Sequence, residues 1–460
     1  MTVSERRRTA RPEREGLARR REAAVPAAGP APRRPQPASA RRVALDVLDL
    51  TLGPLHRPFD EAFDAHPQLE RLAQRDRGFA RLLVATTLRR LGEIDRLVAP
   101  LLRYRPKELS VQNLLRLGAA QLLFLGTPAH AAVGETVRLA AQRFARQAPL
   151  LNAVLRKLAA QGTAALAGQD EARLNTPRWL WDSWVAAYGE EAARAIAAAH
   201  LHEPPLDLHP LRDREHWARE LGAELLPLGI LRRRGGGLIE RLPGFEEGAW
   251  WVQDVAAALP VVLLGEVAGR RIADLCAAPG GKTAQLCAAG ARVTAVERSP
   301  KRAAVLAGNL ARLGFAPEII TADVLDWQPE EPLDMVLLDA PCTATGTIRR
   351  HPDVPWHKGP DDVRRLAEVQ GRLLARATEL VRPGGRLVYA VCSLQPEEGE
   401  EIIAQAVADR RLVREPVRPA ELQGLEATVD PLGQVRTFPS SLAASGGLDG
   451  FFIARLRREG

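Results

Sequence analysis

The sequence is short of cysteine and of long apolar runs. Its 460 residues contain four cysteines, Cys276, Cys287, Cys342 and Cys392, with no C-x-x-C spacing and no matching histidine cluster. That pattern indicates neither a zinc site nor a disulfide framework. No apolar run reaches the roughly 18 to 20 residues that span a bilayer, and the N-terminus lacks the apolar core of a signal peptide. We therefore expect a cytoplasmic protein that needs neither a metal nor a membrane.

Lysine is scarce, and the basic excess is confined to one end of the chain. Arg outnumbers Lys 59 to 5, and 64 basic residues face 56 acidic ones. Residues 1–42 alone carry twelve Arg and four Glu, a net charge of +8, so residues 43–460 sum to about zero. The overall charge therefore does not indicate nucleic-acid binding, which has to be argued from local patches.

Residues 1–41 form an Arg-rich tail with almost no large apolar side chains. Such a composition cannot bury enough apolar surface to offset the entropy lost on ordering, so the tail is predicted to be disordered. Two roles fit it: a solvated tail, or an arm that contacts RNA non-specifically through phosphates. The chain as a whole is 46% apolar and 26% charged, so the remainder can bury sizeable cores.

Residues 42–161 repeat apolar side chains with a 3.6-residue period, as in Val43, Leu45 and Leu48. This predicts an all-helical domain with helices over residues 42–52, 75–91, 93–102, 110–124, 132–144 and 148–160. Residues 162–176 are interpreted as a linker or short helix. Residues 177–250 are predicted to be a small mixed α/β segment, rich in Trp, whose basic loop 232–237 is either a phosphate contact or an exposed hairpin turn.

Residues 251–460 alternate short apolar runs with helical runs, which is typical of a doubly wound parallel sheet. The predicted strands are residues 271–275, 292–296, 318–321, 334–338, 385–391 and 450–456. One intervening helix is bounded by Ser299 as N-cap, Pro300 in its first turn and Gly314 just past its end. The fold class is therefore multidomain, an all-α domain followed by an α/β, Rossmann-like domain.

A turn with adjacent glycines follows the first predicted strand, in the segment DLCAAPGGKT. Such a turn lets backbone N–H groups approach an anionic ligand. Gly281-Lys282-Thr283 matches the end of a Walker A loop, but Cys276 occupies the position of its first glycine, and the dinucleotide motif G-x-G-x-x-G is absent as well. After a nucleotide phosphate bound by a Walker A loop and a dinucleotide, the third ligand that could use this turn is S-adenosylmethionine.

Two carboxylates follow strands at positions where S-adenosylmethionine would need them. Glu297 follows the second strand, with spacing close to that of a ribose-binding carboxylate, and Asp323 follows the third, where it could meet the adenine end. Either carboxylate alone is more often a surface loop charge. Both together favour a cofactor site, because open α/β sheets bind ligands along the C-terminal edge of their strands.

Two cysteines, Cys342 and Cys392, follow the fourth and fifth strands. These strands are expected to be neighbours about 4.8 Å apart, so both thiols can reach one substrate. Such a pair suits methyl transfer to C5 of cytosine. A thiolate adds to C6 and makes C5 nucleophilic, and it leaves once C5 has been methylated and has lost its proton. Asp339, three residues before Cys342, is suitably located to hydrogen-bond N3 of the pyrimidine.

Several long motifs resemble known families. The segments RDRGFARLLVATTLRR and LLNAVLRKL resemble a NusB-type helical domain that binds RNA and proteins. The segments LCAAPGGKT, LLDAPCTATGTIRRHPDVPW and YAVCSLQPEE resemble the RsmB (Fmu/Sun) family of bacterial 16S ribosomal RNA cytosine-C5 methyltransferases. Family-like sequence runs from about residue 42 to residue 457, and the resemblance implies a class I methyltransferase catalytic domain over residues 251–460.

The resemblance also implies the cofactor, S-adenosylmethionine, and the roles of site residues. Cys392 is the implied nucleophile, Cys342 assists product release, and Lys282 and Asp339 help to orient the cytosine. The cofactor-binding residues that it implies are Cys276, Ala277, Ala278, Pro279, Gly280, Gly281, Lys282, Glu297, Asp323 and Asp339. The implied partner is 16S ribosomal RNA, free or in an assembling small subunit, and we expect a monomer without a metal.

Other interpretations stay open at this point. The chain could be a P-loop ATPase with residues 335–339 as Walker B. It could also methylate cytosine C5 in another RNA such as tRNA, or act as a non-catalytic RNA-binding assembly or antitermination factor. Because the body of the protein is near neutral, we expect RNA specificity to come from a concave patch that includes Arg349, Arg350 and His351.

Overall fold

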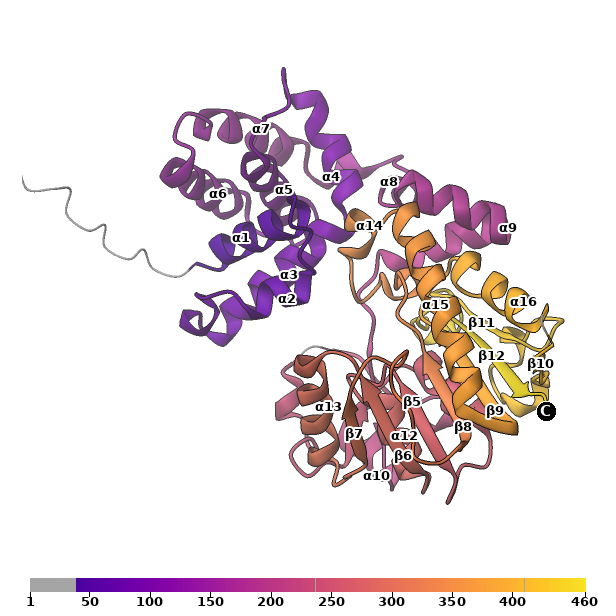
Figure 1. Ribbon diagram of the computed structural model, residues 1–460. Coiled ribbons are helices and arrows are strands. Elements are labelled where there is room, and N and C mark those ends of the chain that lie inside the picture. The colour runs from indigo at the N-terminus through magenta and orange to yellow at the C-terminus, as the bar shows by residue number, and fades with distance from the viewer. Residues whose placement is uncertain (1–38, 236, 409) are drawn as a thin grey trace, which may run out of the picture. The chain divides into compact units, whose positions relative to one another are not determined.

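A computed structural model of the chain describes residues 39–235, 237–408 and 410–460 (Figure 1). Nearly all of the Arg-rich tail lies outside these residues, so its disorder stays a prediction. Gly236, in the basic loop, also lies outside the described residues.

The region after the tail is a bundle of helices, as its periodicity predicts. Its α-helices are α1 (Ala40–Leu52), α2 (Phe59–Asp64), α3 (Gln74–Arg89), α4 (Leu91–Val98), α5 (Leu109–Leu123), α6 (Ala129–Arg143) and α7 (Ala148–Gln161). The periodicity predicts all of these except α2, whose six residues are too few for a clear repeat. In α1 the buried stripe includes Val43, Val47 and Leu48, and it packs with the other helices in one core.

A short helical segment and a small sheet follow the bundle. The linker contains α8 (Glu171–Leu174), and α9 (Arg178–His200) comes next. The small sheet is antiparallel in the order β2-β3-β1-β4, made of β1 (Leu206–Pro210), β2 (Glu224–Leu225), β3 (Leu231–Arg233) and β4 (Trp250–Val252), with α10 (Arg214–Glu220) between β1 and β2. Trp181 and Trp184 are buried, which is the use expected of Trp rings in a small core.

The C-terminal region is built on a mixed eight-stranded sheet in the order β10-β12-β9-β8-β5-β6-β7, with β11 paired to β12. Its parallel strands are β5 (Arg271–Leu275), β6 (Arg292–Glu297), β7 (Glu318–Thr321), β8 (Leu333–Asp339) and β9 (Val381–Val391). The antiparallel strands are β10 (Leu412–Arg414), β11 (Val435–Thr437) and β12 (Phe451–Arg458). Every predicted strand is present, whereas β10 and β11, with three residues each, carry too little pattern to be predicted.

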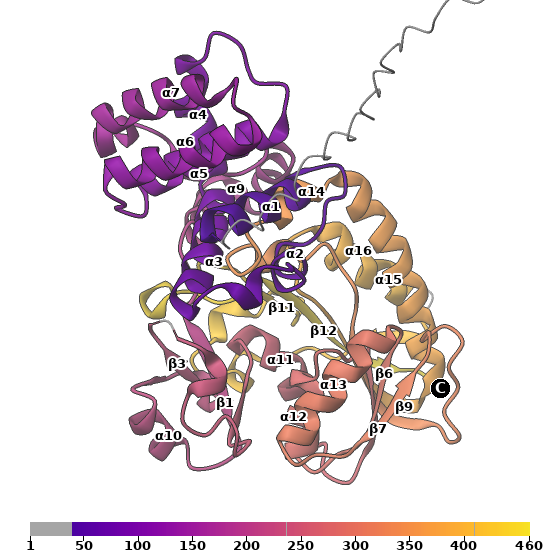
Figure 2. The same ribbon diagram turned by 90° about the vertical axis from the view of Figure 1, so that its left-hand side faces the viewer.

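Alternate side chains of the central strands pack against two layers of helices. Those helices are α11 (Val255–Leu264), α12 (Gly281–Ala288), α13 (Pro300–Arg312), α15 (Pro360–Leu380) and α16 (Glu400–Ala408). Leu337 and Val388 face the core that contains α11 and α12, and α13 lies beside α12 (Figure 2). Leu338 and Tyr389 face the opposite core, which contains α15 and α16. Because both faces are covered, the ends of the strands are left as the place for a site.

The loop between β8 and α15, which contains α14 (Val354–His357), contacts the helical bundle. Trp356 packs against the core of the bundle, and its Nε1 donates to Leu88 O at 2.9 Å. The backbone N–H of Phe59 in α2 donates to Asp353 Oδ2 at 3.0 Å. The segment that follows Cys342 is therefore tied to the bundle.

Within the described ranges, no helix combines the length and the apolar character needed to cross a bilayer. The same residues contain no group of three or more His, Cys, Asp or Glu side chains that could hold a metal ion.

Candidate active site

The turn after β5 adopts a conformation that few residue types allow. Cys276 has a φ of 63° and Gly280 a φ of 108°, both in the left-handed region. A Cβ on Gly280 would lie 2.6 Å from Leu306 Cδ1, so the backbone of the turn packs directly against α13. From the same helix, Arg302 donates to Ala278 O at 2.6 Å. The turn is therefore fixed by α13 at the N-terminus of α12.

Helix α13 begins and ends where the sequence predicts. Ser299 Oγ accepts a hydrogen bond from the Arg302 backbone N–H at 3.4 Å, Pro300 is the first helical residue, and Gly314 beyond the helix has a φ of 77°. Asn309, near the C-terminal end of the helix, donates to Pro279 O at 2.9 Å. The residues that define the ends of α13 therefore also help to fix the position of the turn.

The two carboxylates predicted to hold the cofactor lie along one edge of the sheet. Glu297, at the end of β6, is 3% exposed; its Oε2 accepts from Ala278 N at 3.4 Å and its Oε1 from Ser299 N at 2.9 Å. Asp323 follows β7, which pairs with β6 up to Glu297 and Thr321. Its Oδ1 accepts from the backbone of its own loop at 3.0 Å. Glu297 therefore lies against the turn, and Asp323 lies beyond the end of the neighbouring strand.

Lys282 and Asp339 form an ion pair at the same edge. Lys282 Nζ donates to Asp339 Oδ2 at 2.8 Å and lies 5.4 Å from the centroid of the Phe451 ring. Burial disfavours the charged form of Lys282, but the Asp339 carboxylate more than offsets it and raises the pKa of Lys282. Asp339 Oδ1 accepts no hydrogen bond from the described part of the chain, and the side chain is 29% exposed. One carboxylate oxygen is thus open to a ligand.

The two cysteines meet, as the sequence predicts for loops after neighbouring strands. Asp339 of β8 lies opposite Ala390 of β9 in the parallel register, and the loops that follow bring Cys342 Sγ to 3.4 Å from Cys392 Sγ. The Gly346 backbone N–H donates to Cys392 O at 3.0 Å, which joins the loops further. The hydrogen bond with Cys392, together with burial, raises the pKa of Cys342 well above its usual range.

Asp274 is a site residue that sequence reasoning missed. It is fully buried near the end of β5, where Oδ2 accepts a hydrogen bond from Thr283 Oγ1 at 2.6 Å. Its Oδ1 is buried without a partner among the described residues. Burial raises the pKa of Asp274 to about 7. The available signal was a carboxylate inside an otherwise apolar strand end, directly before the turn.

Glu398 is a second acid that sequence reasoning missed. It is fully buried and accepts hydrogen bonds from residues next to both cysteines, Thr343 and Ser393. Its place in the motif YAVCSLQPEE was visible in the sequence, but nothing there distinguished it from its neighbour Glu397.

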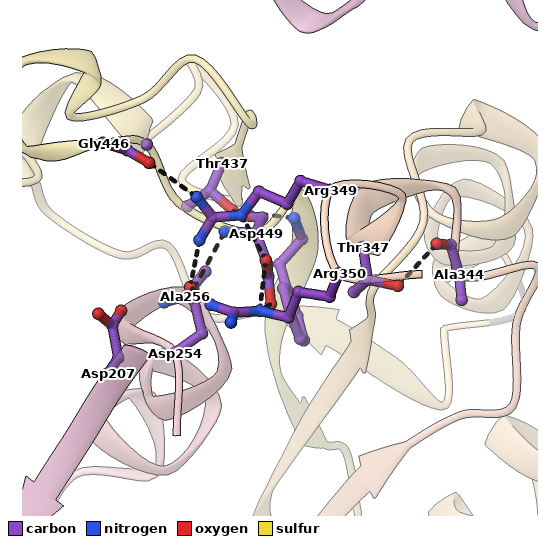
Figure 3. Close-up of polar contacts among 12 residues, drawn as sticks. Asp207, Asp254, Ala256, Ala344, Thr347, Arg349, Arg350, Thr437, Gly446 and Asp449 are labelled. Carbon is purple, nitrogen blue, oxygen red and sulfur yellow. Dashed lines mark hydrogen bonds and ion pairs between the residues drawn. The ribbon is translucent and has the colours of Figure 1, made fainter. Parts of the chain in front are cut away.

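The prediction that Arg349 belongs to an RNA-contacting patch is wrong. This side chain is 2% exposed and lies in a cluster with Arg350, Asp254 and Asp449 (Figure 3). Arg349 contacts Asp254 Oδ2 and Asp449 Oδ1, each at 2.7 Å, and Arg350 contacts the same two carboxylates at 2.7 and 2.8 Å. His351, the third residue of the predicted patch, has its Nδ1 3.1 Å from Oδ2 of Asp60 in α2. Asp254, just before α11, and Asp449, just before β12, therefore neutralise Arg349 inside the protein, whereas the Arg350 side chain stays 23% exposed.

The basic loop 232–237 is also partly interior. Arg232 is 1% exposed and donates to both oxygens of Asp207, at 2.7 and 2.6 Å. The antiparallel register of β1 and β3 places these two residues opposite each other, so a bidentate pair forms. A phosphate contact by Arg232 is therefore excluded, whereas Arg234 remains exposed.

Comparison with known proteins identifies the family. The chain matches the family model for the 16S rRNA methyltransferase RsmB/F over residues 261–457 and that for the NusB family over residues 38–160. It is 38% identical over 413 residues to the ribosomal RNA small subunit methyltransferase B of Pseudomonas putida, which covers 85% of this chain and 92% of that protein. This chain belongs to the RsmB/F family. The protein of the same name from Cronobacter sakazakii is 34% identical over 415 residues, with the same coverages of 85% and 92%.

Solved structures agree with the fold of this RsmB/F family member. The crystal structure of PH0851 has a TM-score of 0.72 at 23% identity and covers 92% of this chain and 99% of that one. A methyltransferase homologue from Pyrococcus horikoshii has a TM-score of 0.50 at 28% identity, with coverages of 60% and 93%. The predicted fold class, a NusB-like helical domain followed by an α/β methyltransferase domain, is confirmed.

As an RsmB/F methyltransferase, the protein methylates ribosomal RNA and uses S-adenosylmethionine as methyl donor. The described residues fit that cofactor. The turn precedes the N-terminus of α12, a carboxylate ends the next strand, and Oδ1 of Asp274, buried just before the turn, has no partner among the described residues. The interpretation of Gly281-Lys282-Thr283 as part of an ATPase is therefore dropped.

Proposed function

We propose that this protein methylates C5 of a cytosine in 16S ribosomal RNA through a covalent bond between Cys392 and C6 of the base. The observation that carries the proposal is the 3.4 Å separation of Cys342 Sγ and Cys392 Sγ after two neighbouring parallel strands. Methylation of a nitrogen or oxygen needs no nucleophile from the protein, whereas C5 of cytosine is too electron-poor to react unaided. Two thiols at the substrate edge favour the carbon reaction.

In this proposal Cys392 is the nucleophile because Asp339, which addresses the edge of the pyrimidine, precedes Cys342 on the same loop. Attack on C6 is then left to the facing loop, whose Cys392 Sγ lies 3.4 Å from Cys342 Sγ. The attacking form of Cys392 is the thiolate. That thiolate adds to C6, and the electron pair of the C5–C6 double bond becomes available at C5.

Asp339 and Lys282 orient the pyrimidine, and Lys282 stabilises the negative charge that develops on it. The open Oδ1 of Asp339 can accept a hydrogen bond from the N4 amino group at the edge of the base. Lys282, 2.8 Å from the other carboxylate oxygen, keeps a positive charge beside that edge while C6 is attacked. The pair supports the addition step without taking part in bond formation.

The cofactor is proposed to lie along the C-terminal edge of the sheet. When bound, S-adenosylmethionine supplies an electrophilic methyl group for C5. Glu297 accepts the ribose hydroxyls and Asp323 meets the adenine end. The full set proposed to hold the cofactor is Cys276, Ala277, Ala278, Pro279, Gly280, Gly281, Lys282, Glu297, Asp323 and Asp339.

Cys342 then assists release of the product. Cys342 is half-buried, so it can give its own proton to solvent water, and the resulting thiolate accepts the proton from C5. The C5–H electron pair re-forms the double bond, and Cys392 leaves as a thiolate.

The helical bundle and the catalytic region divide the work in this proposal. Residues 42–161 form the NusB-like RNA-binding domain, residues 162–176 the linker, residues 177–250 a small mixed segment, and residues 251–460 the catalytic domain. The contacts of α14 with the bundle support coupling between the bound RNA and the loop that carries Cys342.

The test compares two cysteine variants on 16S ribosomal RNA. Cys392→Ala should lose methyl incorporation and form no adduct. Cys342→Ala should accumulate a denaturation-resistant protein–RNA adduct through Cys392, seen as a shifted band on a denaturing gel. An adduct in Cys392→Ala and none in Cys342→Ala would reverse the two roles. Methylation of tRNA rather than 16S RNA would change the substrate, and no methylation of either would favour a non-catalytic assembly factor.

A further inference from the structure

Glu398 is a buried carboxylate whose hydrogen bonds all come from uncharged groups. Its side chain is fully buried after β9. Oε1 accepts from the Thr343 backbone N–H at 2.9 Å and from Gln370 Nε2 at 3.0 Å. Oε2 accepts from the hydroxyls of Thr343 and Ser393. Four donors thus satisfy both oxygens, although burial still raises the pKa of Glu398.

The donors belong to the residues that directly follow the two cysteines. Thr343 comes after Cys342, and Ser393 comes after Cys392. One carboxylate therefore bridges two loops that start from different strands. Gln370 of α15 adds a third attachment, because its Nε2 also donates to Pro341 O at 2.9 Å, directly before Cys342.

The backbone of Glu398 is anchored as well. Its carbonyl accepts from Tyr389 Oη at 2.7 Å, within β9. Arg436, which is paired with Glu400, donates to Ser393 O and so holds the same loop from the other side. A buried carboxylate would be costly if its only role were to fill space, because an apolar side chain would avoid the desolvation.

We propose that Glu398 is a positioning residue that sets the separation of Cys342 and Cys392. This inference rests on the proposed function for its catalytic consequence, but not for its geometric one. The carboxylate touches neither sulfur; it holds the residue after each of them. In Glu398→Gln an amide N–H₂ replaces one carboxylate oxygen, so the two donors that point at that oxygen lose their acceptor. The two loops are then free to separate.

The experiment measures thiol proximity and turnover separately in Glu398→Gln. Proximity is measured as the rate at which phenylarsine oxide captures both thiols, a reaction that joins one arsenic to two sulfurs and releases water. We expect capture and kcat each to fall about 10- to 100-fold, with KM for S-adenosylmethionine unchanged, because small displacements of reacting groups have effects of this size. Glu397→Gln is the matched control, since it makes the same change one residue away, and it should leave both rates unchanged.

The outcomes distinguish this inference from the proposed function. Slow capture together with slow turnover supports both. Slow capture with unchanged turnover leaves Glu398 as the positioning residue but removes the cysteines from the reaction. Capture at the normal rate overturns the positioning role, whatever the turnover. If Glu398→Gln does not fold, as judged by circular dichroism, Thr343→Val and Ser393→Ala each remove one donor, and the same two rates are expected to fall.

Discussion

Asp254 and Asp274 are both buried aspartates near the catalytic sheet, yet their surroundings differ. Asp254 faces two guanidinium groups, and although burial opposes its charge, Arg350 and Arg349 lower its pKa. Asp274 faces the hydroxyl of Thr283, and burial raises its pKa to about 7. The first carboxylate is fully compensated inside the protein. The second retains an oxygen without a partner among the described residues.

This difference distinguishes the structural cluster of Asp254, Asp449, Arg349 and Arg350 from the candidate active site. The Arg349 guanidinium donates to two carboxylates and a backbone carbonyl, so it has no donor left with which to bind a ligand, although it follows a catalytic motif. Asp274, the open oxygen of Asp339 and the adjacent thiols leave binding capacity unused at one edge of the sheet. The predictions below test that separation.

The largest effect is expected from Arg349→Ala, on stability. The substitution leaves Asp254 and Asp449 buried with one arginine fewer, so the free energy of unfolding should fall by about 3 to 5 kcal/mol. Urea unfolding would measure it. RNA affinity per folded molecule should be unchanged; a variant of normal stability with weakened RNA binding would restore Arg349 to the RNA surface.

Asp274→Asn should remove part of the pH dependence of stability. The ordinary Asp pKa is about 4, so between about pH 4 and pH 7 the unfolded chain loses the Asp274 proton while the folded protein keeps it. Stability from this group is therefore full below about pH 4, falls as the pH rises, and levels off above about pH 7. The total change is on the order of a few kcal/mol.

Urea unfolding of both proteins across that range checks this prediction. The stability of the unmodified chain should fall relative to that of Asp274→Asn as the pH rises. A difference that does not vary with pH would mean that Asp274 is ionised throughout, like Asp254.

Glu297→Ala should weaken cofactor binding by about 1 to 3 kcal/mol, the size of a charged hydrogen bond. Isothermal titration calorimetry with S-adenosylmethionine would measure it. Glu318→Ala is the control, because Glu318 is an exposed acid on the neighbouring strand that bonds only Thr294 in the described chain. Equal affinities of the two variants would remove Glu297 from the cofactor site.

The smallest effect is expected from deletion of residues 1–38, a segment with ten Arg and four Glu. These charges should add affinity for RNA only through phosphates. The truncated protein should bind more weakly at low salt, with a shallower salt dependence, and methylate the same nucleotide. Methylation at other cytosines would give the tail a part in specificity.

Much of the fold could be predicted because its signals are local. The 3.6-residue repeats of the bundle and the apolar runs of β5 to β9 report burial within each element, and Ser299, Pro300 and Gly314 mark α13 from its own sequence. The short elements α2, β10 and β11 escape such signals. Their conformation depends on what they pack against.

The candidate site divides in the same way. The meeting of Cys342 and Cys392 was predictable, since adjacent parallel strands must end at the same edge. The use of Glu398 was not, because its bonds to Thr343 span 55 residues. Nor was the burial of Arg349, whose partner Asp254 is 95 residues away.

Residue order alone established which chemical groups stand at the ends of which strands: two thiols, a lysine, and the acids Glu297, Asp323 and Asp339. Packing between distant segments established which of the charged groups are neutralised and which stay open. Arg349 and Lys282 are both cations beside a strand-end motif. Arg349 is enclosed by two carboxylates, whereas Lys282 pairs with one oxygen of Asp339, whose other oxygen stays open to a ligand. Charge compensation depends on partners within a few ångströms, and only folding brings those partners together.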